Sequence, residues 1–325
     1  MPTDPEPSTG PTGGGLRRRL SARAARAARW AVTHPGPSVP LLALVLTAGF
    51  LLVVTLLPRK PAFVFVEAQT ETLLYRVARP EVAGLPLVDA TVRTDGETAT
   101  VATGLLQPAE GALVRYRWSP AAIAVELSVR QGSAGTLVVD EEERPLPAWA
   151  VAVFPHPTSA DSPAARPLPI AGPAEIGAEF GAPLAPRPGQ RRVTGLMRGG
   201  EVQVFGRAVL WFNDDALYPV TDFPLPAGGR LTGDRPLADE AGSERLANWY
   251  GLARIGDEGF QVNATTETDS LRLHRPGVRE AETFGIGLLT RLFNDPGLAA
   301  ITIFVVVFTV AMQMLADWLP LWRGK

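Results

Sequence analysis

The sequence contains no cysteine and only three histidines. The absence of cysteine excludes a disulfide scaffold, a thiolate zinc site, an iron–sulfur cluster and a cysteine nucleophile. Lysine is also scarce, because Lys60 and Lys325 are the two lysines among 31 basic residues. This preference for arginine, together with many alanines, glycines and prolines, indicates a bacterial source with a GC-rich genome.

Sequence signatures of catalysis are lacking as well. The chain has no G-x-S-x-G nucleophile elbow, no H-E-x-x-H zinc motif, no G-x-x-x-x-G-K-[ST] phosphate loop and no G-x-G-x-x-G after a strand. His34, His156 and His274 do not share metal-ligand spacing, and we interpret them as surface residues. We therefore expect no catalytic residue, no metal ligand and no bound cofactor.

Two acidic segments have the composition of a calcium site but not its spacing. The first is Asp140–Glu143, and the second comprises Asn213, Asp214, Asp215 and Asp222. Carboxylate and amide oxygens bind calcium, yet neither segment matches the ligand spacing of an EF-hand. We interpret both segments as solvated turns.

The net charge of −2 is unevenly distributed along the chain. Residues 1–37 carry six arginines against two acidic residues, and residues 317–325 carry two basic residues against one acidic residue. Residues 38–57 are uncharged, so residues 58–316 hold a net charge of −7. Binding to phosphates requires a basic surface, so this acidic middle argues against nucleic acid as a partner.

Two long uncharged runs stand out in the hydropathy pattern. PLLALVLTAGFLLVVTLL covers residues 40–57, and LAAITIFVVVFTVAMQMLA covers residues 298–316. A helix of about 20 apolar residues crosses about 30 Å of hydrocarbon, so both runs predict transmembrane helices. Asp295 is the expected N-cap of the second helix, with Pro296 at its first position. The first run is followed by LPRKPAF rather than by a cleavage site, which predicts an uncleaved signal anchor.

The charges that flank the two runs predict their orientation. Basic residues gather on the cytoplasmic side of membrane proteins, and they precede the first run and follow the second. We therefore expect a bacterial inner (cytoplasmic) membrane protein with both termini in the cytoplasm and a periplasmic or extracellular central domain. The residues assigned to topology or to the lipid headgroup level are Arg17, Arg18, Arg19, Arg23, Arg26, Arg29, Trp30, Trp318 and Trp322.

Between the two runs, apolar and polar residues alternate as they do in half-buried strands. Strands are expected within 63–77, 87–94, 97–103, 113–118, 122–130, 135–140, 148–154, 201–212, 246–255 and 259–275. Asp95-Gly96 favours a type I′ hairpin turn, and a strand about every ten residues is typical of a β-sandwich. The predicted fold class is a membrane protein with two transmembrane helices flanking a mainly-β, β-sandwich-like extracytoplasmic domain.

Proline and tryptophan positions refine this prediction. Nine prolines lie between Pro155 and Pro188, and proline cannot donate a hydrogen bond to a β-ladder, so this segment is expected to be a loop rather than a central strand. Several aromatic residues fall within apolar strand patterns, which favours core packing over a platform for sugars. They are Trp118, Trp149, Trp211, Trp249 and Tyr250.

Together these patterns divide the chain into six segments. They are a cytoplasmic tail over 1–37, disordered and then basic; transmembrane helix 1 over 38–57; β domain or domains over 58–279, with a Pro-rich loop at 155–190; a juxtamembrane amphipathic helix over 280–295; transmembrane helix 2 over 296–316; and a cytoplasmic tail over 317–325. A short helix packed on the β domain is the alternative for 280–295.

The second run carries a polar stripe. At 100° per residue, its polar side chains fall on one side of a helix, and we predict that this stripe contacts a partner. The stripe consists of Thr302, Thr309, Gln313 and Asp317. Expected partners are the lipid bilayer and, through this second helix, other membrane proteins or further copies of the chain.

These features favour a non-enzymatic, inner-membrane-anchored scaffold or accessory subunit of a cell-envelope complex. Its β domain would serve protein interaction. Two alternatives stay open: a subunit of a two-helix gated pore, which rests on topology alone, and a periplasmic glycan-binding protein, which rests on the aromatic residues.

Overall fold

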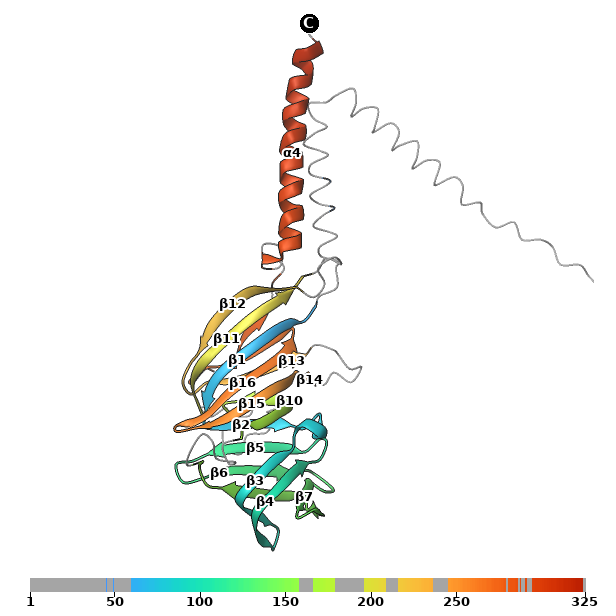
Figure 1. The fold of residues 1–325 in the computed structure, drawn as a ribbon. Coiled ribbons are helices and arrows are strands. Elements are labelled where there is room, and N and C mark those ends of the chain that lie inside the picture. The colour runs from blue at the N-terminus through green and yellow to red at the C-terminus, as the bar shows by residue number, and fades with distance from the viewer. Residues whose placement is uncertain are drawn as a thin grey trace, which may run out of the picture. The chain divides into compact units, whose positions relative to one another are not determined.

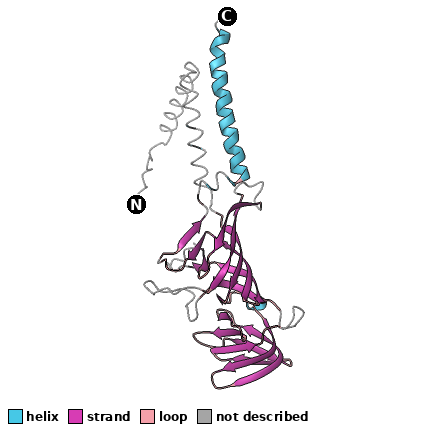
Figure 2. Ribbon diagram, turned by 90° about the vertical axis from the view of Figure 1, so that its left-hand side faces the viewer, coloured by secondary structure: helices cyan, strands magenta, loops and turns pink. Residues whose placement is uncertain are grey.

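The computed structural model is dominated by antiparallel strands (Figures 1 and 2). The chain divides into two compact units. One is Arg59–Leu298, which holds the described strands, and the other is Met1–Pro58 with Ala299–Lys325, which holds most of one long helix. The residues described are 45, 49, 60–157, 166–178, 196–208, 216–235, 245–278, 280–285, 287, 290 and 294–323.

The first group of strands, sheet A, brings both ends of the β region together. Its order is β12 (Leu217–Leu225), β11 (Met197–Arg207), β1 (Ala62–Thr70), β16 (Gly259–Thr268), β15 (Asn248–Gly256) and β10 (Leu168–Ile176) (Figure 1). β1 is a central strand, since it pairs along its length with β11 on one side and β16 on the other. Its alternating burial is the pattern that the sequence predicted.

The second group, sheet B, continues from β10. Its order is β18 (Glu282–Gly285), β17 (Ser270–His274), β13 (Arg230–Arg235), β10, β2 (Thr72–Arg76), β5 (Leu113–Trp118), β6 (Ile123–Ser128), β9 (Trp149–Phe154), β3 (Leu85–Thr94), β4 (Thr98–Pro108), β7 (Gly135–Val139) and β8 (Glu142–Leu146). The two-residue strand β14 (Arg245–Leu246) pairs with β13, and a short 3-10 helix, η1, covers Pro80–Val82. β10 joins the two sheets.

β10 corrects the prediction of a loop across the Pro-rich segment. Its first part pairs with β15, and its last residues pair with β2 and β13. The carbonyl of Pro169 accepts from the Tyr116 hydroxyl at 2.7 Å, and the carbonyl of Ala171 accepts from the Ala78 amide at 2.9 Å. Alternate residues of a strand face the same way, so Pro169 and Pro173 point their nitrogens away from β15. The ladder with β15 therefore loses no donor at either proline.

The type I′ turn of the β region lies in a different hairpin from the one that the sequence predicted. The hairpin at Asp95-Gly96 is confirmed, because β3 and β4 pair up to Arg93↔Thr98. Its predicted type I′ geometry is wrong: Gly96 has a φ of +97°, whereas Asp95 is not among the described residues with positive φ. Asp140 and Glu141, at φ +49° and +67°, form the type I′ turn between β7 and β8 instead.

Replacing Glu141 by glycine is expected to stabilise the protein by about 0.5–1 kcal/mol, because a left-handed backbone strains a non-glycine residue. The thermal unfolding midpoint should rise. Glu143→Gly is the matched control: Glu143 lies in β8 with extended backbone, so it should lower the midpoint. A midpoint for Glu141→Gly at or below that of the wild type contradicts the turn assignment.

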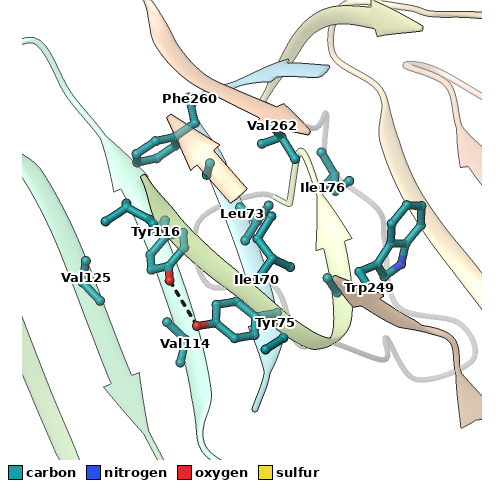
Figure 3. Close-up of a cluster of buried hydrophobic side chains, with 14 of the residues drawn as sticks. Leu73, Tyr75, Val114, Tyr116, Val125, Ile170, Ile176, Trp249, Phe260 and Val262 are labelled. Carbon is teal, nitrogen blue, oxygen red and sulfur yellow. Dashed lines mark hydrogen bonds between the residues drawn. The ribbon is translucent and has the colours of Figure 1, made fainter. Parts of the chain in front are cut away.

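The core extends through both sheets and contains a buried tyrosine pair (Figure 3). The hydroxyls of Tyr75 and Tyr116 lie 3.1 Å apart, and the two rings meet edge to face with centroids 5.6 Å apart. Both side chains have no exposed surface. Burial raises the pKa of both tyrosines well above the ordinary value of 10, so both remain protonated at an alkaline pH at which an exposed tyrosine ionises.

The structure contradicts the predicted two-span membrane protein. The second uncharged run lies in helix α4 (Pro296–Arg323), and the first run lies outside the described residues apart from Val45 and Gly49. Within the described ranges, no helix has the length and apolar character needed to cross a membrane. The two-span membrane part of the fold class and the inner-membrane location that depended on it are therefore contradicted, while the mainly-β part is confirmed. The predicted signal anchor over 38–57 lies outside the described residues apart from Val45 and Gly49.

The segment expected to be an amphipathic helix over 280–295 begins as a strand. Glu282–Gly285 forms β18, which pairs with β17. Leu271 and Leu273 are buried at alternate positions of β17, so one face of this strand is apolar. The edge of β17 supplies the hydrogen-bonding groups with which β18 pairs. Pairing with β17 therefore favours a strand at Phe284, although the apolar residues around Phe284 are spaced as they would be on one face of a helix.

Candidate functional site

The first candidate site is the exposed apolar surface of α4. Asp295 caps this helix as predicted: its Oδ1 accepts from the amides of Gly297 at 2.9 Å and Leu298 at 3.2 Å. Seven large apolar side chains between 42% and 68% exposed follow the cap, namely Ile303, Phe304, Val306, Val307, Phe308, Val310 and Met314. Phe304 and Phe308 stack with ring centroids 6.1 Å apart. At 100° per residue, these side chains cover about 200° of the helix circumference.

The predicted polar stripe lies on this same helix. Thr302 and Thr309 are half-buried, and the hydroxyl of Thr309 donates to the carbonyl of Val305 at 2.7 Å. Thr309 is therefore satisfied within its own helix. The side chains of Gln313, Asp317, Trp318 and Trp322 lie outside the described residues, as do Arg17, Arg18, Arg19, Arg23, Arg26, Arg29 and Trp30. The partner contact of the stripe stays a prediction.

The acidic segments belong to turns and strands. Asp140 and Glu141 form the β7–β8 turn, and Glu142 pairs with Arg144 at 2.7 Å on the exposed strand β8. This hydrogen bond lowers the pKa of Glu142. Asp222 lies in β12, while residues 213–215 lie outside the described ranges. The described residues contain no cluster of metal-ligating side chains.

The predicted core role of the tryptophans is confirmed at two positions. Trp249 has no exposed surface, and Trp118 is 8% exposed with its indole nitrogen donating to the carbonyl of Gly256 at 3.0 Å. Trp149 is half-buried and donates to Glu126, while Trp211 lies outside the described residues. The Arg79 guanidinium lies 5.1 Å from the centre of the Tyr250 ring. Trp118 and Trp249 therefore present no open face on which a sugar could stack.

The histidines have ordinary surroundings. His156 is half-buried, and its Nε2 lies 2.6 Å from the carbonyl oxygen of Ser119, while its ring meets that of Trp118 edge to face. His274 ends β17 opposite Arg230 of β13. His34 lies outside the described residues. His156 follows β9 and His274 ends β17, and these two strands of sheet B do not pair with each other.

The second candidate site is a pocket of about 180 Å³ between the outer strands β12 and β18. Val64, Val204 and Leu271 supply its apolar wall. The rings of Phe223 in β12 and Phe284 in β18 stack 4.1 Å apart, inclined by 13°, and Phe284 also lines the pocket. Each of these two strands has one ladder partner in the described part of the chain.

Comparison with known proteins adds no relationship to this geometry. Neither the protein-family models, nor the curated proteins, nor the solved structures give a match to the chain. Function must therefore be inferred from the chain's own surfaces. Of those surfaces, the α4 side chains were visible in the sequence as an apolar run, but the pocket was not. Its lining comes from β1, β11, β12, β16, β17, β18 and the β16–β17 turn, which no local sequence period connects.

Proposed function

We propose that this protein is a non-enzymatic scaffold or accessory subunit that binds the helices of a partner protein through α4. The observation that carries this proposal is the exposed apolar surface of α4, whose seven large side chains cover about 200° of its circumference. Monomeric soluble proteins rarely expose apolar patches of this extent, and such patches mark interaction sites.

The width of the apolar arc indicates what kind of partner α4 accepts. A helix that lies on a single flat surface needs an apolar stripe of roughly 100°. An arc about twice as wide is covered when the helix enters a groove between partner helices. The stacked Phe304 and Phe308 rings would serve as anchors there, since aromatic side chains dominate the energetics of many interfaces.

Isolation of the tagged full-length chain from its native source, followed by native mass spectrometry, tests this proposal. We expect a foreign subunit in a fixed ratio to the 34.6 kDa chain. The double variant Phe304→Glu/Phe308→Glu should lose that subunit, because two charges would be buried without partners. Leu252→Glu is the matched control: Leu252 in β15 is 43% exposed, and its replacement should leave the complex intact.

Three outcomes would contradict the proposal. The wild-type chain could be isolated alone, it could assemble only with itself, or the Phe304→Glu/Phe308→Glu variant could retain the foreign subunit. Circular dichroism of the variant keeps the comparison interpretable, because glutamate is a good helix former and the helical signal should be unchanged.

A further inference from the structure

The pocket between β12 and β18 is the right size for one small apolar group. Its volume is about 180 Å³, and an engineered apolar cavity of about 150 Å³ accommodates benzene. Val204 at its wall keeps 7% of its surface exposed, and Val220 and Phe284 are half-buried, so these are the apolar side chains that a ligand can reach. These side chains belong to the paired strands β11, β12 and β18, so the apolar part of the site is preformed.

The polar part of the lining carries one charge, and that charge is negative. Thr221, Thr283 and Ser270 contribute hydroxyl groups, and Asp269, in the turn between β16 and β17, is the charged residue of the lining. In the described part of the chain, no basic side chain forms an ion pair with Asp269.

Basic residues on the neighbouring strands are already engaged elsewhere. Arg272 of β17 pairs with Asp234, and Arg207 of β11 pairs with Glu267. Lys60, just before β1, donates to the carbonyl of Ala208 at 3.1 Å. A carboxylate at the rim of an apolar pocket favours a positively charged ligand, and the net charge of −7 over residues 58–316 acts in the same direction.

We propose that this pocket binds a small organic ammonium ion whose apolar part is about the size of one aromatic ring. The ring lies against Val204 and Val220, and Phe284 covers one side of it. The ammonium group binds the carboxylate of Asp269, with Thr283 and Thr221 as further acceptors. This inference concerns the β region and does not depend on a partner of α4.

Titration of the full-length chain with phenethylammonium, followed by calorimetry and ligand-observed NMR, tests the proposal. Phenethyl alcohol and phenylacetate carry the same ring with no charge and with a negative charge. We expect phenethylammonium to bind about tenfold more tightly than the alcohol, as a hydrogen bond to a charged group predicts, and phenylacetate not to bind.

Three variants locate the binding site. Asp269→Asn should weaken phenethylammonium binding about tenfold, because it removes the charge and keeps the shape. Val220→Phe fills the pocket from the edge strand β12 and should abolish binding. Asp222→Asn removes an exposed charge from the same strand outside the lining and should leave affinity unchanged. Far-ultraviolet circular dichroism checks that each variant is folded.

Several results would overturn this inference. Absence of binding to the wild type, equal affinity for the alcohol or for phenylacetate, or wild-type affinity in a folded Asp269→Asn or Val220→Phe variant would each do so. None of these results bears on the foreign subunit expected at α4, so the two proposals fail independently.

Discussion

Replacing Glu175 by leucine is expected to destabilise the β region by about 3–5 kcal/mol, because it removes a carboxylate that forms an ion pair with the buried guanidinium of Arg230. Glu175 lies in β10 and Arg230 in β13, with their charged atoms 3.3 Å apart. The two side chains are only 3% and 4% exposed, so water cannot replace the lost partner. Urea unfolding followed by tryptophan fluorescence measures the change.

Two further variants separate the cost of breaking the buried ion pair from other effects. Arg230→Met should cost a similar amount, whereas the double variant Glu175→Leu/Arg230→Met should recover most of the loss, since apolar residues often replace a buried pair without penalty. Glu142→Leu is the surface control: its partner Arg144 is 59% exposed, and its loss should change stability little. A loss below about 1 kcal/mol in either buried single variant contradicts the prediction.

The strands predicted from sequence are those whose alternation is set by burial on one face. β1, β5 and β6 alternate strictly between buried and half-buried or exposed side chains, and this period is visible without any structure. The hairpin of β3 and β4 was visible for a related reason, because Asp95-Gly96 marks a turn between two such patterns. Local periodicity and turn chemistry therefore predicted most of the β region.

The strands that the sequence did not predict contain residues that weaken the strand signal. β10 carries Pro169 and Pro173, and the edge strand β12 carries Pro219 and Pro224. A proline is compatible with a strand wherever its nitrogen faces away from the ladder, and only the pairing partners reveal which side that is. β8 was hidden in the same way, because its charged residues and Pro145 suit an exposed edge.

The pocket could not be predicted because it depends on register between distant strands. Ala62 and Gly285 both line it, although they lie at opposite ends of the β region in sequence. Among the described strands, the hydrogen-bonded pairings connect β1 to β18 through β16, β15, β10, β13 and β17 in turn. A shift of one residue in any of these pairings would change which side chains face inward.

Gly172→Ala is expected to cost about 4 kcal/mol, because it acts where β10 passes from sheet A to sheet B. Gly172 has a φ of +151°, which alanine adopts at a cost of about 2 kcal/mol. A Cβ atom there would lie 1.9 Å from the carbonyl oxygen of Arg76, and relief of that clash by a backbone shift costs about 2 kcal/mol more. Chemical unfolding of the variant measures the sum.

Gly111→Ala isolates the part of this cost that comes from the dihedral angle. Gly111 has a φ of +75°, and a Cβ atom there would meet nothing within 4 Å, so the expected loss is only about 1 kcal/mol. The difference between the two variants is the cost of the close approach between β10 and the end of β2. Equal losses would show that the backbone of β10 moves freely away from Arg76, and that the junction between the sheets does not require glycine at 172.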